Sequence, residues 1–247
     1  MTQHVMLNNV AHKDLRVVTR YAADFGDNVA TVMVVPTEFG DLQREYPIFF
    51  RKDPGTGDLT AIALLGLQKD ENLYLDDKGW NADYVPGVIA RGPFFIGFQQ
   101  REVAGKVEAV PVVHVDLDHP RVSKAEGEPV FNPQGGNTGY LDRIAALLNA
   151  VHQGLEVSKP MFEAFAAADL LEPVQLEIKV NSSEQYNLTG LLTINREKLM
   201  NLDADTLFKL HRAGYLQAAF LVGASLGNVQ RLVDLKGRRS RQAAMAS

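Results

Sequence analysis

Residues 38–95 read EFGDLQREYPIFFRKDPGTGDLTAIALLGLQKDENLYLDDKGWNADYVPGVIARGPFF, and this stretch decides the class of fold. An apolar run at residues 46–51 is followed by DPGTGD at 53–58, a strong turn signal because proline presets one backbone dihedral angle and glycine supplies a positive φ. A second apolar run, residues 59–67, comes after the turn. Two such runs around a turn predict a β-hairpin.

Shorter apolar runs, several of them rich in β-branched residues, predict further strands on both sides of this hairpin. They lie at residues 15–18, 29–35, 72–75, 94–100 and 110–117, with a turn near Ala104–Gly105 and a long loop over 118–139. Residues 84–91 contain Pro86 and Gly87 and predict either an irregular segment or a short helix.

Beyond residue 139 the apolar residues recur at helical spacing. This spacing predicts helices over 140–153, 159–171, 204–212 and 223–236, the first ending at Gly154 and the third capped by Asp203. Alternating apolar residues over 174–180, together with 186–194, predict a second hairpin. Residues 215–222 fit either a strand or a buried helix.

The order of these elements favours an α+β fold over a doubly wound α/β fold, because strands and helices do not alternate strictly. We expect a mixed, mainly antiparallel sheet of about nine strands, with four or five helices mostly in the C-terminal half. The length suits a single domain over residues 1–247, with 1–10 and 237–247 as loose tails.

Composition excludes several classes of function. The chain has no cysteine, which excludes disulfides and thiolate metal sites, and its net charge of -5 argues against nucleic acid as a partner. No apolar stretch reaches the roughly 18 residues of a membrane span. The N-terminal residues lack the basic and apolar regions of a signal peptide. The sequence therefore predicts a cytoplasmic protein without a membrane span.

Several blocks of sequence, in order over about residues 10–236, are similar to the bacterial SapC-like family, which is named after a surface-layer-associated protein. The similar residues are His12, Leu15–Val17, Glu38–Phe39, Tyr46–Phe50, Ala63–Leu67, Glu71–Leu73, Trp80, Tyr84–Pro86, Arg91–Phe94, Asp116, Arg121–Ser123, Glu126–Gly127, Phe131, Leu188–Leu191, Leu207–Leu216 and Ser225–Leu226.

The resemblance implies an accessory or binding protein linked to surface-layer or outer-membrane nutrient-uptake systems. It implies protein partners such as a flavin-dependent halogenase or an outer-membrane receptor. It carries over no reaction, cofactor or catalytic residue, so the catalytic set is unknown.

Aromatic residues of the opening stretch are the candidates for a ligand or peptide groove, with core packing as their alternative use. The candidate ligand-binding residues are Trp80, Tyr84, Arg91 and Phe94, beside the further aromatic residues Phe95 and Phe98.

A metal site is the alternative hypothesis. His114 and Asp116 lie two residues apart on a predicted strand and therefore share a face. With His12, His152 or His211 they make the two-histidine, one-carboxylate set of a non-haem Fe(II) oxygenase. Fe(II) is the only cofactor that this hypothesis implies, and a polar outer face of the strand is the alternative interpretation.

Three weaker motifs have structural alternatives. The glycine-rich residues 132–139 before a helix suggest anion binding, or a plain loop. The acidic residues Asp76, Asp77 and Asp83 suggest calcium binding, or a solvated turn. Ser225 imitates the Gly-x-Ser-x-Gly nucleophile elbow, which requires a strand-to-helix turn.

Overall fold

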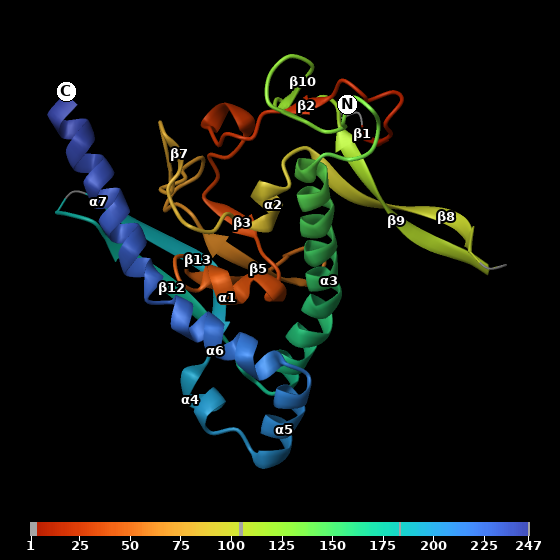
Figure 1. Ribbon diagram of the computed structural model, residues 1–247. Coiled ribbons are helices and arrows are strands. Elements are labelled where there is room, and N and C mark those ends of the chain that lie inside the picture. Colours follow the sequence, from red (N-terminus) through yellow and green to blue (C-terminus); the bar gives the residue numbers. More distant parts are fainter. Residues whose placement is uncertain (1–3, 104–105, 183, 247) are drawn as a thin grey trace. The chain divides into compact units, whose positions relative to one another are not determined.

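The computed structural model describes residues 4–103, 106–182 and 184–246, and Figure 1 labels its helices and strands. Contacts between Cα atoms divide the chain into two compact units. Unit 1 comprises Met1–Asp27 and Gly87–Gln153, and unit 2 comprises Asn28–Pro86 and Gly154–Ser247. The expected single domain over 1–247 stays a prediction, and each unit is described by itself.

Unit 1 is built on short antiparallel strands. One described sheet has the order β1-β9-β8, with β1 at His4–Met6, β8 at Phe94–Val103 and β9 at Lys106–Asp116. A second places β2 (Arg16–Val17) between β10 (Val122–Ser123) and β11 (Glu128–Pro129). The helical elements are η1 (Ala23–Phe25), α2 (Gly87–Ala90) and the part of α3 (Gly139–Ala167) up to Gln153.

The core of unit 1 forms where α3 covers the β8–β9 strand pair. Leu141, Ile144 and Leu148 recur at helical spacing and are buried on one face of α3. They belong to the same buried cluster as Phe94 of β8 and Val115 of β9. The periodicity read from the sequence therefore identifies the packed face of this helix.

Unit 2 contains a five-stranded antiparallel sheet of order β12-β13-β4-β5-β3. Its strands are β3 (Thr31–Met33), β4 (Ile48–Lys52), β5 (Leu59–Leu64), β12 (Leu171–Lys179) and β13 (Gln185–Ile194), and a separate pair joins β6 (Leu75–Asp76) to β7 (Gly79–Trp80). The helical elements are η2 (Pro36–Glu38), α1 (Phe39–Leu42), α3 from Gly154 onward, α4 (Arg196–Met200), α5 (Ala204–Arg212), α6 (Tyr215–Ser225) and α7 (Asn228–Ala246).

Aromatic packing holds α3 to the sheet of unit 2. Phe50 of β4 is fully buried and contacts Phe162 edge-on, with ring centroids 5.4 Å apart. Phe165, one helical turn further along α3, lies 6.2 Å from the same ring. The β4–β5 hairpin that carries Phe50 is the hairpin predicted from residues 46–67.

The α+β class is confirmed, with antiparallel strands and most helices in the C-terminal half. Residues 215–222 are helical, so the open choice between strand and helix is decided for α6. The final helix begins at Asn228 rather than 223. Regular structure also occupies segments expected to be loose, since β1 covers His4–Met6 and α7 continues to Ala246. The turn expected near Ala104–Gly105 lies outside the described residues.

The two helices predicted on either side of Gly154 are one helix, α3, so that prediction is wrong. Gly154 lies where the helix closely approaches another segment of unit 2. A Cβ atom at this position would come within 2.5 Å of Val35 Cγ2 and 2.7 Å of Thr37 Oγ1. The glycine is therefore a packing requirement and not a helix end.

None of the helices within the described ranges is both long enough and apolar enough to cross a membrane.

We expect Gly154→Ala to lower the free energy of unfolding by about 1–2 kcal/mol, because the overpacked methyl group outweighs the gain in helix propensity. Gly223→Ala in α6 is the matched control, since a Cβ there meets no atom within 4 Å. It should raise the free energy of unfolding by about 0.5–1 kcal/mol. Urea denaturation measures both, and equal shifts for the two variants would contradict the packing explanation.

Candidate functional site

Two of the candidate ligand-binding residues, Trp80 and Tyr84, lie in a partly buried network of unit 2. The Tyr84 hydroxyl donates to Glu38 Oε1 at 2.7 Å. The Trp80 indole N–H donates to the Tyr46 hydroxyl at 2.9 Å, and Tyr46 is fully buried. Burial, and then the Glu38 carboxylate, raise the pKa of Tyr84, which keeps its hydroxyl a proton donor. These hydrogen bonds hold the loop that contains Trp80 and Tyr84 to Tyr46 and Glu38.

Glu45 organises the same loop through its carboxylate. Oε2 accepts the backbone N–H groups of Asp83 and Tyr84, at 2.9 and 3.1 Å. Oε1 lies 3.1 Å from Arg231 Nη2 of α7. One carboxylate thus connects the loop before α2 to the last helix, which explains a buried acid directly before the apolar run at Tyr46.

The other two candidates, Arg91 and Phe94, belong to unit 1. Phe94 is fully buried in the core, so core packing is its observed role. The Arg91 guanidinium donates to the Phe94 carbonyl at 3.0 Å and lies 4.1 Å from the centre of the Phe95 ring. The structure thus assigns the four candidates to two units, and a ligand role for them stays a prediction.

His114 and Asp116 share a face of β9, as the period of the strand predicts, but their side chains have different neighbours. The His114 ring lies against Gly97 of β8, where a Cβ would come within 2.6 Å of Nε2. Asp116 is buried and lies 3.8 Å from His4 Nε2 of β1. His4 was not among the sequence candidates, although it pairs with Asp116 in the sheet register.

The expected third ligands are engaged elsewhere. His12 Nδ1 accepts the Asn8 backbone N–H, the His152 ring lies 5.1 Å from the Phe98 ring, and His211 belongs to α5 in unit 2. Over residues 4–103, 106–182 and 184–246, no three His, Asp or Glu side chains form a group that holds a metal. The Fe(II) hypothesis stays a prediction, which metal analysis of the purified protein tests.

The weaker motifs have local structural roles. In the glycine-rich loop, the Asn132 side chain donates to the Asn137 carbonyl and Asn137 donates to Asp142. Asp76 accepts the Lys78 backbone N–H within the acidic turn. Ser225 is buried at the end of α6, donates to the Val222 carbonyl and accepts the Ile48 N–H. It ends a helix and does not follow a strand, so the nucleophile-elbow interpretation is wrong.

A buried ion pair that sequence reasoning did not identify organises the N-terminal segment of unit 1. Arg121 Nη2 lies 2.6 Å from Asp27 Oδ2, and both side chains are about 95% buried. Arg121 Nη1 also donates to the Val18 and Arg20 carbonyls, and the guanidinium lies over the Tyr21 ring. The Arg121 guanidinium therefore holds the stretch of chain from Val18 to Asp27 in place.

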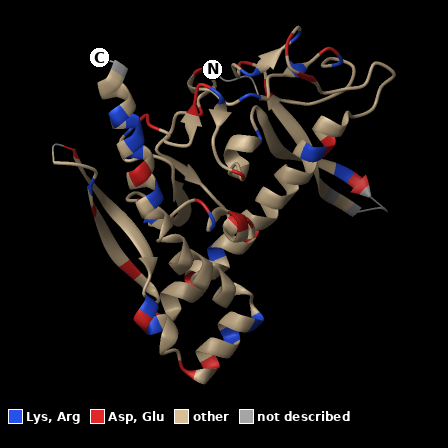
Figure 2. Cartoon of the chain, turned by 60° about the vertical axis from the view of Figure 1, so that its left-hand side comes forward, with Lys and Arg blue, Asp and Glu red and all other residues tan. Residues whose placement is uncertain are grey.

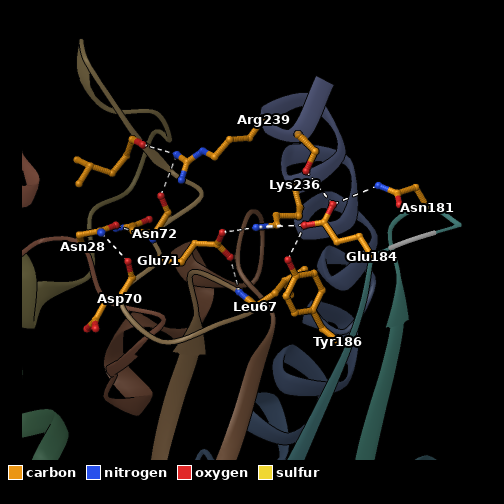
Figure 3. Close-up of polar contacts among 12 residues, drawn as sticks. Asn28, Leu67, Asp70, Glu71, Asn72, Asn181, Glu184, Tyr186, Lys236 and Arg239 are labelled. Atoms are coloured by element: carbon orange, nitrogen blue, oxygen red, sulfur yellow. Dashed lines mark hydrogen bonds and ion pairs between the residues drawn. The ribbon is translucent and has the colours of Figure 1, made fainter. Parts of the chain in front are cut away.

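The corresponding cluster of unit 2 surrounds Lys236 of α7, and Figure 3 shows it. Lys236 Nζ lies 2.7 Å from Glu71 Oε1 and 3.4 Å from Glu184 Oε1. Glu71 Oε2 accepts the Leu67 N–H, and Glu184 accepts from the Tyr186 hydroxyl. Burial alone lowers the pKa of Lys236, but its bonds with Glu71 and Tyr186 outweigh burial and raise it.

A further arginine of α7 completes this attachment. Arg239 Nη2 donates to the carbonyls of Asn72 and Leu75, on the segment that leads into β6. Figure 2 shows Lys and Arg recurring along α7. Arg239 falls within residues 237–247, which were expected to be a loose tail, and together with Lys236 it holds α7 to the sheet region of unit 2.

The strands β8 and β9 continue past the core of unit 1 as a two-stranded antiparallel ribbon, the β8–β9 ribbon (residues 94–103 and 106–116), seen in Figure 1. β1 pairs only with residues 114–116 of β9, apart from a single bond from the Leu7 N–H to the Val113 carbonyl. Within the described ranges no other strand pairs with the outer edge of β8. The ribbon therefore presents backbone donors and acceptors on both sides.

The protein belongs to the SapC family, because the sequence model of that family matches residues 7–232. The resemblance stated from the sequence blocks is thereby confirmed. Comparison with curated proteins and with solved structures found no match.

We expect Lys236→Met to lower the free energy of unfolding by about 3–5 kcal/mol, because it leaves the Glu71 carboxylate buried without its cation. Lys198→Met is the matched control, since Lys198 pairs with Asp169 at the surface, where such a pair contributes about 0–1 kcal/mol. Adding Glu71→Gln to Lys236→Met should recover part of the loss in a double-mutant cycle. Strictly additive effects in urea denaturation would contradict a coupled pair.

The stability should also depend on Glu184 at acid pH. Hydrogen bonds from the Tyr186 and Ser240 hydroxyls lower the pKa of Glu184 in the folded protein. The stabilisation is therefore present above the unfolded-state pKa of about 4.3 and is lost as the pH falls through the lower folded-state value. We expect Glu184→Gln to be less stable than wild type at pH 7 and the difference to shrink as acid is added, measured as melting temperature against pH. A difference that stays constant would disprove this role.

Proposed function

We propose that this protein is an accessory, partner-binding member of the SapC family. It works beside bacterial surface-layer or outer-membrane nutrient-uptake systems, and it binds its partner by adding a strand of the partner to the β8–β9 ribbon. The single observation that carries the proposal is the open edges of the β8–β9 ribbon, which pair with no described strand over most of their length.

The edges of the ribbon favour a strand as the partner element. An isolated two-stranded hairpin is at best marginally stable in water, and three strands are the usual minimum. From residue 112 of β9 down to residue 106, toward the tip, the ribbon has only two strands. An unpaired edge offers a row of N–H and C=O groups that a strand of another chain satisfies.

One face of the ribbon supports the same conclusion. Phe94 and Ile96 of β8 share that face and pack in or against the core of unit 1. Phe98 continues the same face and is 51% exposed, and Val107 of β9 on this face is 73% exposed. The apolar stripe thus extends from the core into solvent, and exposed stripes of this kind mark protein contacts.

Three buried carboxylates of unit 2 have structural partners within that unit, which favours a binding role over a catalytic one. The side chains of Glu38, Glu45 and Glu71 accept hydrogen bonds from within unit 2, and each helps to hold a loop or a helix. Their chemistry is used in positioning the chain. The partners that the family resemblance implies are a flavin-dependent halogenase or an outer-membrane receptor.

Co-expression with a tagged partner tests the proposal. The chain is produced with a flavin-dependent halogenase of the same bacterium and, separately, with a nutrient receptor of its outer membrane. We expect one of them to retain the wild-type chain in affinity purification, and the double variant Phe98→Glu/Val107→Glu to lose at least tenfold in retention, because charges replace its apolar stripe.

Phe208→Glu is the matched control, since Phe208 is 64% exposed on α5 of unit 2 and should leave retention unchanged. Loss of retention by both variants, or by neither, would refute the ribbon as the binding surface. The cytoplasmic location expected from the sequence is a separate proposal, which favours the halogenase over the outer-membrane receptor as the partner, and fractionation of the bacterium tests it.

A further inference from the structure

A pocket of about 260 Å³ opens on unit 2 between the end of β13, α4 and α6. Its walls are almost entirely aliphatic or aromatic. The residues that line it are Ile194, Arg196, Leu199, Met200, Phe220, Gly223 and Ala224. Ile194 and Leu199 are buried, whereas Met200 and Phe220 are 67% and 48% exposed, so the pocket has an apolar floor and an apolar mouth.

One charged group contributes to this apolar lining. Arg196 lies at the start of α4, directly after Asn195, whose side chain caps that helix. Within the described residues, no hydrogen bond or ion pair involves the Arg196 guanidinium. A guanidinium presents a planar fork of donors that matches a carboxylate, and it is more weakly hydrated than an ammonium group.

Gly223 leaves room in the part of the pocket that α6 lines. It lies inside α6, where an alanine would favour the helix, yet a Cβ at this position meets no atom within 4 Å. Gly223 lines the pocket, so the open space at its missing side chain is not filled by a neighbouring residue. An apolar pocket lined in part by one charged residue resembles the usual small-ligand site, which is mostly apolar with a few polar groups.

We propose that this pocket binds a small amphipathic carboxylic acid, with its apolar body between Leu199, Phe220 and Gly223 and its carboxylate on Arg196. The apolar walls select a hydrocarbon or aryl group, and the single cation selects an anionic head over a neutral or cationic one. The site lies in unit 2 and does not depend on the β8–β9 ribbon, so either proposal stands if the other fails.

Isothermal titration calorimetry of the intact chain with octanoate, octanol and octylammonium tests the charge preference. We expect octanoate to bind at least tenfold more tightly than octanol, and octylammonium to bind most weakly. No heat of binding at millimolar octanoate, or equal affinity for the three ligands, would overturn the proposal.

Two variants test the place of binding. Gly223→Leu should abolish octanoate binding, because its side chain enters the open space, and Arg196→Gln should weaken binding at least tenfold while leaving octanol unaffected. The controls are Gly40→Leu, where a Cβ also meets nothing within 4 Å, and Arg212→Gln on α5.

Melting curves establish that each variant is folded before the titration. A folded Gly223→Leu protein that still binds octanoate would put the ligand elsewhere and would overturn the proposed site. Loss of binding in the Arg212→Gln control would show a general effect of surface charge and would overturn the role of Arg196.

Discussion

The architecture of unit 2 depends on the ion pair between Lys236 and Glu71. An ammonium group loses its hydration when it is buried, and only a well-placed carboxylate with further hydrogen bonds compensates for that loss. For Lys236 the carboxylates come from two places far apart in the sequence: Glu71 lies in the segment after β5, and Glu184 lies in the turn of the β12–β13 hairpin. The pair therefore forms only when three separate stretches of chain are in their final positions, and α7 acts as the element that joins them.

Local signals were sufficient to predict much of the fold. The turn DPGTGD between two apolar runs predicted the β4–β5 hairpin, and Asp203 predicted the start of α5, where its side chain accepts the Thr206 N–H. The prediction failed at Gly154, because the reason for that glycine is the close approach of Val35 and Thr37, which no local pattern contains. A period of apolar residues also could not distinguish strand from helix for the apolar segment of α6.

For the candidate sites, the sequence predicted which residues share a face of a strand but not which side chains they contact. Strand period correctly placed His114 and Asp116 on one face of β9, but their contacts depend on Gly97 and on His4 of another strand. Glu45 follows Arg44, and Glu71 lies between Asp70 and Asn72, so no local pattern marked either of them as a buried charge. The partner of Glu71 was equally hidden, since Lys236 lies 165 positions away along the chain.

The division of the chain has a consequence for its synthesis. Residues 28–86 of unit 2 leave the ribosome between the two segments of unit 1, and the sheet strands β12 and β13 with α7 follow much later. The nascent β4–β5 hairpin therefore keeps the edge of β4 open until β13 is synthesised and pairs with it, and an open edge is the state in which strands associate with wrong partners.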